Sequence, residues 1–366
     1  TELLAEQHFA TLDAWLTPLD QSVAWLSGRT KGQARQHVLQ QLASGEAPLV
    51  VGTHALFQDD VHFHRLGLII VDEQHRFGVH QRLSLADKGV GDEHPHQLAL
   101  TATPIPRSLA MVAYGDLDCS IIDELPPGRK PVTTTLVDHT RRDAVMRRVG
   151  SACQEGRQAY WVCTAIEESD TLDIEAAEAT LGQLQQALPD VRIGLVHGKL
   201  KPAEKAAVMA AFKAGDIQLL VATTVIEVGV DVPNASLMII DNAERLGLAQ
   251  LHQLRGRVGR GAIDSHCLLL YRQPLSDTAQ QRLKGMQESH DGFVIAEADR
   301  EIRGPGELLG TRQTGLAAFR IALLPEHEPL LIEAQEIAAK LYERDPGRAQ
   351  ALMQRWAGAR ADFARV

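Results

Sequence analysis

The chain has 366 residues, which is enough for two or three domains, and its 45% hydrophobic and 23% charged residues are typical of a soluble globular protein. A formal net charge of −10 argues against a passive nucleic-acid coat, but it leaves room for a protein that grips DNA in a local groove and then releases it. The four cysteines are far apart, and no apolar run approaches the length of a membrane span. We therefore expect a protein of the reducing cytosol, without a disulfide framework, a zinc site or a membrane anchor.

Short apolar runs separated by helical stretches fill the first third of the chain. Each run is apolar throughout instead of alternating, which predicts parallel strands that are buried on both faces. The expected strands are PLVVG (48–52), LGLIIVD (66–72) and QLALTAT (97–103). The expected helices are 31–44, 75–87 and 104–114. DELPPGRKPV (123–132) is rich in proline, glycine and charge, and it predicts a linker.

The same pattern restarts after this linker. The expected strands are QAYWVCTAI (158–166), RIGLVHG (192–198), IQLLVATT (217–224), ASLMIIDN (235–242) and SHCLLLY (265–271). The expected helices between them are 141–154, 171–187, 201–214 and 247–258. After Tyr271 the strand pattern stops, and the remainder is expected to be helical and to end in two amphipathic helices.

Alternation of strands and helices predicts the α/β fold class, with parallel sheets covered by helices on both faces. We expect a first α/β domain at 1–125, which is incomplete, and a second at 126–273. A helical domain is expected at 274–366.

The stretch IIVDEQHRFG (69–78) ends an apolar strand in two adjacent carboxylates, Asp72 and Glu73. In open α/β sheets, ligands bind beyond the carboxyl ends of the strands. One carboxylate can hold Mg²⁺, and the second can orient or deprotonate a water that attacks a γ-phosphate. The alternative is a helix N-cap, with Asp72 capping and Glu73 in the first turn.

LALTATPIPRSLA (98–110) follows the next apolar strand and places two hydroxyls at its end. Thr101 and Thr103 could hydrogen-bond the carboxylate site and relay its state to the neighbouring unit. Ordinary capping before a proline that opens a helix is the alternative.

In the second unit, QLHQLRGRVGRG (250–261) carries Arg257 and Arg260 three residues apart on an expected helix, so both guanidiniums should project from one face. Arginine suits a polyphosphate because it is permanently charged and donates through a planar fork. Each interleaved glycine costs a helix about 1 kcal/mol relative to alanine, which disfavours a purely structural role. A basic helix that faces solvent or nucleic acid remains the alternative.

These motifs, in this order, resemble those of a superfamily-2 helicase. DEQH (72–75), TAT (101–103) and QLRGRVGR (253–260) are similar to its motifs II, III and VI. VIEVGVDVP (225–233), TELLAEQH (1–8) and VGTHAL (51–56) are similar to motifs V, Ia and Ib. GFVIAEADREIRGPGELLGTRQTG (292–315) closely resembles the translocation motif of the RecG family of branch-migration helicases. By residue pattern alone, RGPG should break a helix and GTRQTG should form a loop, either as a hinged hairpin or as a plain interdomain turn.

The resemblance implies two RecA-like lobes followed by a translocation hairpin, ATP and Mg²⁺ as cofactors, and a role for particular residues. Asp72 would coordinate Mg²⁺, and Glu73 would activate water. Gln74 and His75 would couple the ATP site to the DNA site, and Arg257 and Arg260 would be arginine fingers. Nucleotide binding would also involve Gly229, Asp231 and Gln253. Coupling to movement would involve Thr101, Thr103, Arg282, Arg303 and Gln313. The DNA path would run near Thr1, Glu2, Thr53 and His54.

The implied function is an ATP-dependent double-stranded DNA translocase that drives branch migration and regression of stalled forks and Holliday junctions. Branched double-stranded DNA would be its substrate, single-stranded DNA-binding protein a further candidate partner, and the expected form a monomer at the nucleoid. Two alternatives stay open. One is the motor of a transcription-repair coupling factor, whose motifs usually read DEEH and GAGELLG. The other is a non-catalytic docking module.

A P-loop, GxxxxGK[ST], is missing from this order of motifs. The only Gly-Lys pair is Gly198-Lys199, which is followed by Leu200 and lies in the second unit. We therefore expect this chain to be the C-terminal part of such a helicase, starting at motif Ia, with its P-loop and DNA-reading wedge domain upstream. By itself it can lack ATPase activity. An exposed sheet edge would also make it poorly soluble.

Overall fold

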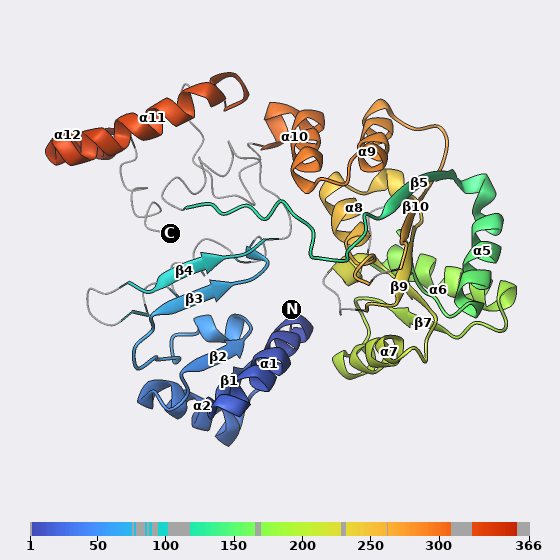
Figure 1. Cartoon of the computed structure of the whole chain (residues 1–366), viewed down its shortest axis with the longest axis horizontal. Coiled ribbons are helices and arrows are strands. Elements are labelled where there is room, and N and C mark those ends of the chain that lie inside the picture. Colours follow the sequence, from blue (N-terminus) through green and yellow to red (C-terminus); the bar gives the residue numbers. More distant parts are fainter. Residues whose placement is uncertain are drawn as a thin grey trace. The chain divides into compact units, whose positions relative to one another are not determined.

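The computed structural model describes residues 2–74, 77, 85, 88–89, 94–101, 118–164, 170–227, 232–261, 263–308 and 324–356 (Figure 1). The chain divides into two compact units, and each is described by itself. Unit 1 comprises Thr1–Cys119 and Arg303–Val366, and unit 2 comprises Ser120–Ile302. Most of the expected helix 75–87 and all of the helix 104–114 lie outside the described residues.

Unit 2 is built on a six-stranded sheet in the order β5-β10-β9-β6-β8-β7, in which every neighbouring pair is parallel. The strands β6, β8 and β9 are buried along their whole length, as their uninterrupted apolar sequences predict. The strands are β5 (Thr133–Asp138), β6 (Gln158–Val162), β7 (Ile193–Val196), β8 (Leu219–Ala222), β9 (Ala235–Ile240) and β10 (His266–Tyr271).

Helices cover both faces of this sheet. Neighbouring residues of a strand point to opposite faces, and β6 shows both environments. Trp161 is fully buried in a cluster with residues of α5 and α6, whereas Tyr160 packs edge-on against Phe212 of α7 at 4.9 Å between ring centroids. The expected α/β architecture is therefore confirmed for this unit. Its helices are α5 (Arg142–Gln154), α6 (Asp170–Ala187), α7 (Pro202–Ala214) and α8 (Leu248–Arg255).

Unit 1 begins with α1 (Glu2–Leu16), β1 (Val23–Leu26), α2 (Gly32–Ser44) and β2 (Leu49–Gly52). β1 and β2 form one parallel pair, and β3 (Leu68–Val71) and β4 (His96–Ala99) form a second. Leu26 and Leu42 lie in the core beneath β1 and β2, while Ile69 and Val71 pack with Leu85 beneath β3. The parallel pairing is as expected for an α/β lobe.

The expected burial of β3 and β4 on both faces is wrong for this chain. β3 alternates between exposed and buried residues, and Ile70 is 57% exposed. Leu68, Leu98 and Leu100 are exposed as well. The reason is that β3 and β4 form only a two-stranded sheet, one face of which rests on the small core around Ile69.

Three further elements were not expected from the sequence: α1, β1 and β5. β5 (TTTLVD) is a sheet-edge strand with exposed threonines, so it lacks the continuous apolar run that marks its neighbours. β1 has only four residues between polar ends.

The C-terminal part is helical, with α9 (Asp277–Glu288), α10 (Gly292–Leu308), α11 (Leu324–Arg344) and α12 (Pro346–Trp356). The expected helix break at RGPG (303–306) is wrong, because α10 continues through it to Leu308. Pro305 removes one helical hydrogen bond, the one that its own amide would donate to the carbonyl four residues earlier, and such a loss can kink a helix without ending it. The expected loop GTRQTG (310–315) lies outside the described residues. None of the helices in the described part is long and apolar enough to cross a membrane.

Candidate functional site

The two carboxylates that end β3 adopt an unusual backbone. Glu73 has a φ of 53°, in the left-handed region that residues with a side chain rarely occupy. Asp72 Oδ1 accepts a hydrogen bond from the Glu73 amide at 2.8 Å, and Asp72 Oδ2 lies 2.9 Å from His8 Nε2. Glu73 Oε2 is buried. Strained backbone of this kind is often found where a side chain must be aimed at a ligand.

Gln74 joins this turn to the end of the neighbouring strand. Its amide donates to the Leu100 carbonyl at 3.1 Å, and the Leu100 amide donates to the Val71 carbonyl at 2.8 Å. Thr101, the first residue of motif III, follows Leu100 directly, so motif III begins beside this turn. The Gln74 side chain is 7% exposed, and its Nε2 has no hydrogen-bond partner within the described part of the chain.

The residues around Asp72 suit Mg²⁺ held together with a nucleotide. Among the described residues, no three His, Cys, Asp or Glu side chains lie close enough to hold a metal ion alone. Mg²⁺ in nucleotide enzymes usually takes one or two carboxylates, with water and phosphate oxygens completing its shell. A single, partly exposed carboxylate at a strand end fits that pattern.

The residues expected along the DNA path lie on α1 and after β2. Glu2 pairs with Arg29 at 2.9 Å. His54 begins a short 3₁₀ helix, η2 (His54–Phe57), and its Nε2 lies 4.0 Å from where a Cβ on Gly28 would stand. The loops that follow β1 and β2 are therefore neighbours. Thr53 Oγ1 is buried without a hydrogen-bond partner among the described residues.

The two expected arginine fingers do not share a helix face, which corrects the prediction. α8 ends at Arg255, and the Arg257 and Val258 amides turn back to the carbonyls three residues earlier. Arg257 is half-buried, whereas Arg260 is exposed and donates to the Gly256 carbonyl at 3.4 Å. The glycines end the helix, so both arginines stand on a loop.

Gly259 in this arginine loop cannot be replaced without strain. Its φ is +75°, and a Cβ there would lie 2.6 Å from Val132 Cγ2. The Gly259 carbonyl accepts a hydrogen bond from Arg129 Nε at 2.9 Å. The segment expected to be a linker therefore helps to hold the arginine loop.

Two arginines, Arg255, which is buried, and Arg282, which is half-buried, fasten α8 to α9. Arg255, at the end of α8, donates to the Met286 carbonyl at 2.9 Å and to the Ser289 carbonyl at 2.8 Å, where α9 ends. Arg282 of α9 donates to the Leu246 and Glu244 carbonyls, just before α8 begins. Burial lowers the pKa of Arg255, and desolvation of the neighbouring half-buried His252 lowers its pKa to about 4.

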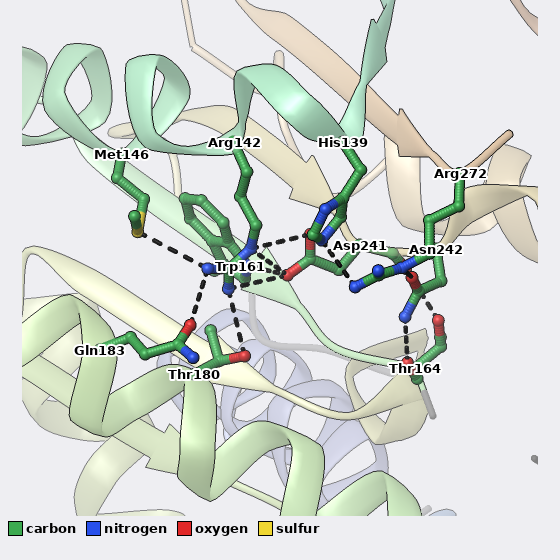
Figure 2. Close-up of polar contacts among 10 residues, drawn as sticks. All are labelled: His139, Arg142, Met146, Trp161, Thr164, Thr180, Gln183, Asp241, Asn242 and Arg272. Carbon is green, nitrogen blue, oxygen red and sulfur yellow. Dashed lines mark hydrogen bonds and ion pairs between the residues drawn. The ribbon is translucent and has the colours of Figure 1, made fainter. Parts of the chain in front are cut away.

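A polar cluster lies where β5, β6, β9 and β10 reach their carboxyl ends (Figure 2). Asp241, which follows β9 and is 5% exposed, receives the Arg142 guanidinium at 3.2 Å and Trp161 Nε1 at 2.7 Å. Thr164 Oγ1 donates to the Asp241 carbonyl at 2.8 Å. Arg142 also lies over the Trp161 ring, 5.1 Å from its centroid. This cluster joins the ends of β6 and β9, and the chain runs from the end of β9 to α8 and motif VI.

Replacing Asp241 with alanine is expected to lower the free energy of unfolding by about 3 to 5 kcal/mol, because it leaves Arg142 buried without its counter-charge. Urea denaturation would measure the change. Asp264→Ala is the matched control: Asp264 pairs with Lys130 at 2.8 Å but is exposed, so its loss should change stability little. Equal effects of the two substitutions would contradict a buried, structural ion pair.

Several sequence-predicted residues lie outside the described part: Thr1, His75, Thr103, Gly229, Asp231 and Gln313, together with the side chain of Arg303. Gln253 is half-buried on α8. Sequence reasoning missed His8, Arg255 and the Asp241 cluster. His8 lies 64 residues from Asp72, Arg255 lies 31 residues from Met286, and Arg142 lies 99 residues from Asp241, so no local pattern marks these contacts.

Comparison with known families assigns the class of protein. The DEAD/DEAH box helicase family matches residues 1–112, and the helicase conserved C-terminal domain matches residues 141–262. These matches cover both α/β lobes and the motifs on them. The chain is therefore built on a helicase motor.

A third match, residues 289–355, is to domain 3 of the ATP-dependent DNA helicase RecG, C-terminal. RecG of Escherichia coli (strain K12) is 63% identical over 97% of this chain, and RecG of Bacillus subtilis is 47% identical over 94%. The chain belongs to the RecG family. It spans about half the length of these relatives, 52% and 50% respectively.

A solved structure of RecG bound to a three-way DNA junction matches 90% of this chain and 42% of its own, with 42% sequence identity and a TM-score of 0.69. A helicase named MrfA, bound to DNA, matches with a TM-score of 0.59 at 18% identity and supports the fold alone.

Proposed function

We propose that this chain is the motor part of an ATP-dependent enzyme that moves along double-stranded DNA and drives branch migration and fork regression. The observation that carries the proposal is the turn after β3. There Asp72 and a strained Glu73 end a strand, and Gln74 ties them to the start of motif III. The relatives named above as ATP-dependent helicases support it.

In this proposal Asp72 holds Mg²⁺ and Glu73 accepts a proton from the attacking water. Arg257 and Arg260 would contact the phosphates and stabilise the charge that develops on the transferred phosphoryl group. Gln253, Gly229 and Asp231 complete the nucleotide contacts. Each of these roles rests on the motif and the residue chemistry.

Movement of the second lobe would reach the helical region through Arg255 and Arg282. Arg255 adjoins the arginine loop and ends on α9, and Arg282 returns from α9 to the segment before α8. A change at the phosphates would therefore shift α9 together with α8. Arg303 and Gln313, further along, are proposed to carry that shift to the DNA, and Thr101, Thr103 and His75 to signal the state of the ATP site.

We further propose that the substrate is branched double-stranded DNA, as the RecG structure on a three-way junction suggests. Thr1, Glu2, Thr53 and His54 would contact it, a role that rests on their motifs alone. The protein would act as a monomer at the nucleoid, in the cytoplasm, with single-stranded DNA-binding protein as a candidate partner.

The test is ATP turnover by the protein at its full natural length, with a synthetic three-way junction or with linear duplex of equal length and composition. We expect faster turnover with the junction, and conversion of a labelled junction strand into the migrated product. Tight junction binding without any ATP hydrolysis would overturn the proposal and favour a docking module.

A further inference from the structure

His8 lies on α1, and its imidazole is the long-range partner of Asp72. Its Nε2 is 2.9 Å from Asp72 Oδ2, while the Glu73 amide holds Oδ1 at 2.8 Å. The first contact joins residues 64 positions apart, and the second joins chain neighbours. With both oxygens engaged, the carboxylate cannot turn about its own axis without losing a hydrogen bond.

This contact contributes little to stability on its own. The His8 side chain is 48% exposed and that of Asp72 is 33% exposed, and exposed pairs typically contribute little to the free energy of unfolding. Its importance would instead lie in orientation. A metal-binding carboxylate performs best when an outer partner fixes which lone pairs it presents.

α1 also links this carboxylate to the loops that follow β1 and β2. Glu2, in its first turn, pairs with Arg29 in the loop after β1, close to the His54 loop. His8 lies six positions after Glu2 on this helix, a rise of about 9 Å. A displacement at the Arg29 end would therefore be carried along a rigid element to the imidazole.

We propose that His8 is a positioning residue that fixes the Asp72 carboxylate for the Mg²⁺-bound nucleotide. Through His8, a displacement at the Glu2 end of α1 would also move that carboxylate. The inference rests on the proposed metal role of Asp72. It adds to it a residue outside the carboxylate motif.

The test uses the full-length protein with a non-hydrolysable ATP analogue and Mn²⁺ in place of Mg²⁺, followed by electron paramagnetic resonance. His8→Phe keeps the ring and removes its nitrogens. It is expected to weaken Mn²⁺ binding about three- to tenfold, the equivalent of one modest hydrogen bond. The Mg²⁺ concentration for half-maximal turnover should rise by the same factor, with the melting temperature unchanged.

His8→Gln is expected to restore metal affinity, because its amide can donate from a similar position. His37→Phe, on the exposed face of α2, is the matched control and should behave as the unaltered protein. Unchanged metal affinity in His8→Phe, or failure of His8→Gln to restore it, would overturn the inference.

Asp72→Asn separates this inference from the proposed function. If Asp72→Asn abolishes Mn²⁺ binding and His8→Phe leaves it unchanged, only the role of His8 is wrong. If Asp72→Asn leaves the affinity intact, the metal role of Asp72 fails and the inference fails with it.

Discussion

Replacing Arg257 with alanine is expected to lower ATP turnover by about 10³- to 10⁵-fold, the usual loss when an arginine finger is removed. Arg257 is half-buried on the loop that follows α8, where the hydrogen bond from Arg129 to the Gly259 carbonyl holds the backbone. A guanidinium on such a loop can meet the phosphoryl group without a large loss of conformational entropy. Turnover would be measured at saturating ATP and junction DNA.

Arg257→Lys should recover little of this loss, because an ammonium cannot donate two parallel hydrogen bonds to phosphate. Arg148→Ala is the control, since Arg148 is an exposed arginine on α5 of the same lobe. If Arg257→Ala and the control both retain nearly full turnover, Arg257 does not reach the transition state.

Replacing Glu73 with glutamine should reduce turnover by about 10²- to 10⁴-fold, the range expected for loss of a general base. The two side chains have the same shape, so the turn after β3 and the Asp72 contact to the residue 73 amide should persist. Nucleotide affinity is therefore expected to stay close to that of the unaltered protein. Single-turnover kinetics would separate the chemical step from binding.

Glu46→Gln, an exposed position after α2, is the matched control for the change in charge. A Glu73→Gln protein that hydrolyses ATP at the normal rate but unwinds no junction would move Glu73 from the chemistry to the coupling step. That result would count against Glu73 as the general base.

The strands that could be predicted are those whose surroundings are uniform. β6, β8 and β9 have apolar neighbours on both faces, and their sequences carry that signal without interruption. β5 sits at an edge, so its threonines can face solvent and its pattern matches no simple template. α8 ends at Arg255, three residues before the predicted end at residue 258. The apolar spacing continues to Val258, but Gly256 and Gly259 end the helix.

The chemistry at strand ends could be anticipated because adjacent functional groups in sequence remain adjacent in space. Asp72, Glu73 and Gln74 are of this kind. Contacts between distant segments could not be anticipated. Nothing near His8 indicates Asp72, and nothing near Arg142 indicates Asp241 or Trp161. These pairings depend on how the lobes fold, which local periodicity does not encode.

The contacts of Arg255 and Arg282 lie at opposite ends of α8. One joins its last residue to the end of α9, and the other joins α9 to the segment that leads into its first turn. Two helices joined at a single point can rotate relative to each other, whereas helices joined at two separated points cannot. Tension applied through α9 would load these hydrogen bonds together and in shear. Under a stretching force, the packed pair α8 and α9 should therefore be among the last parts of the lobe to unfold.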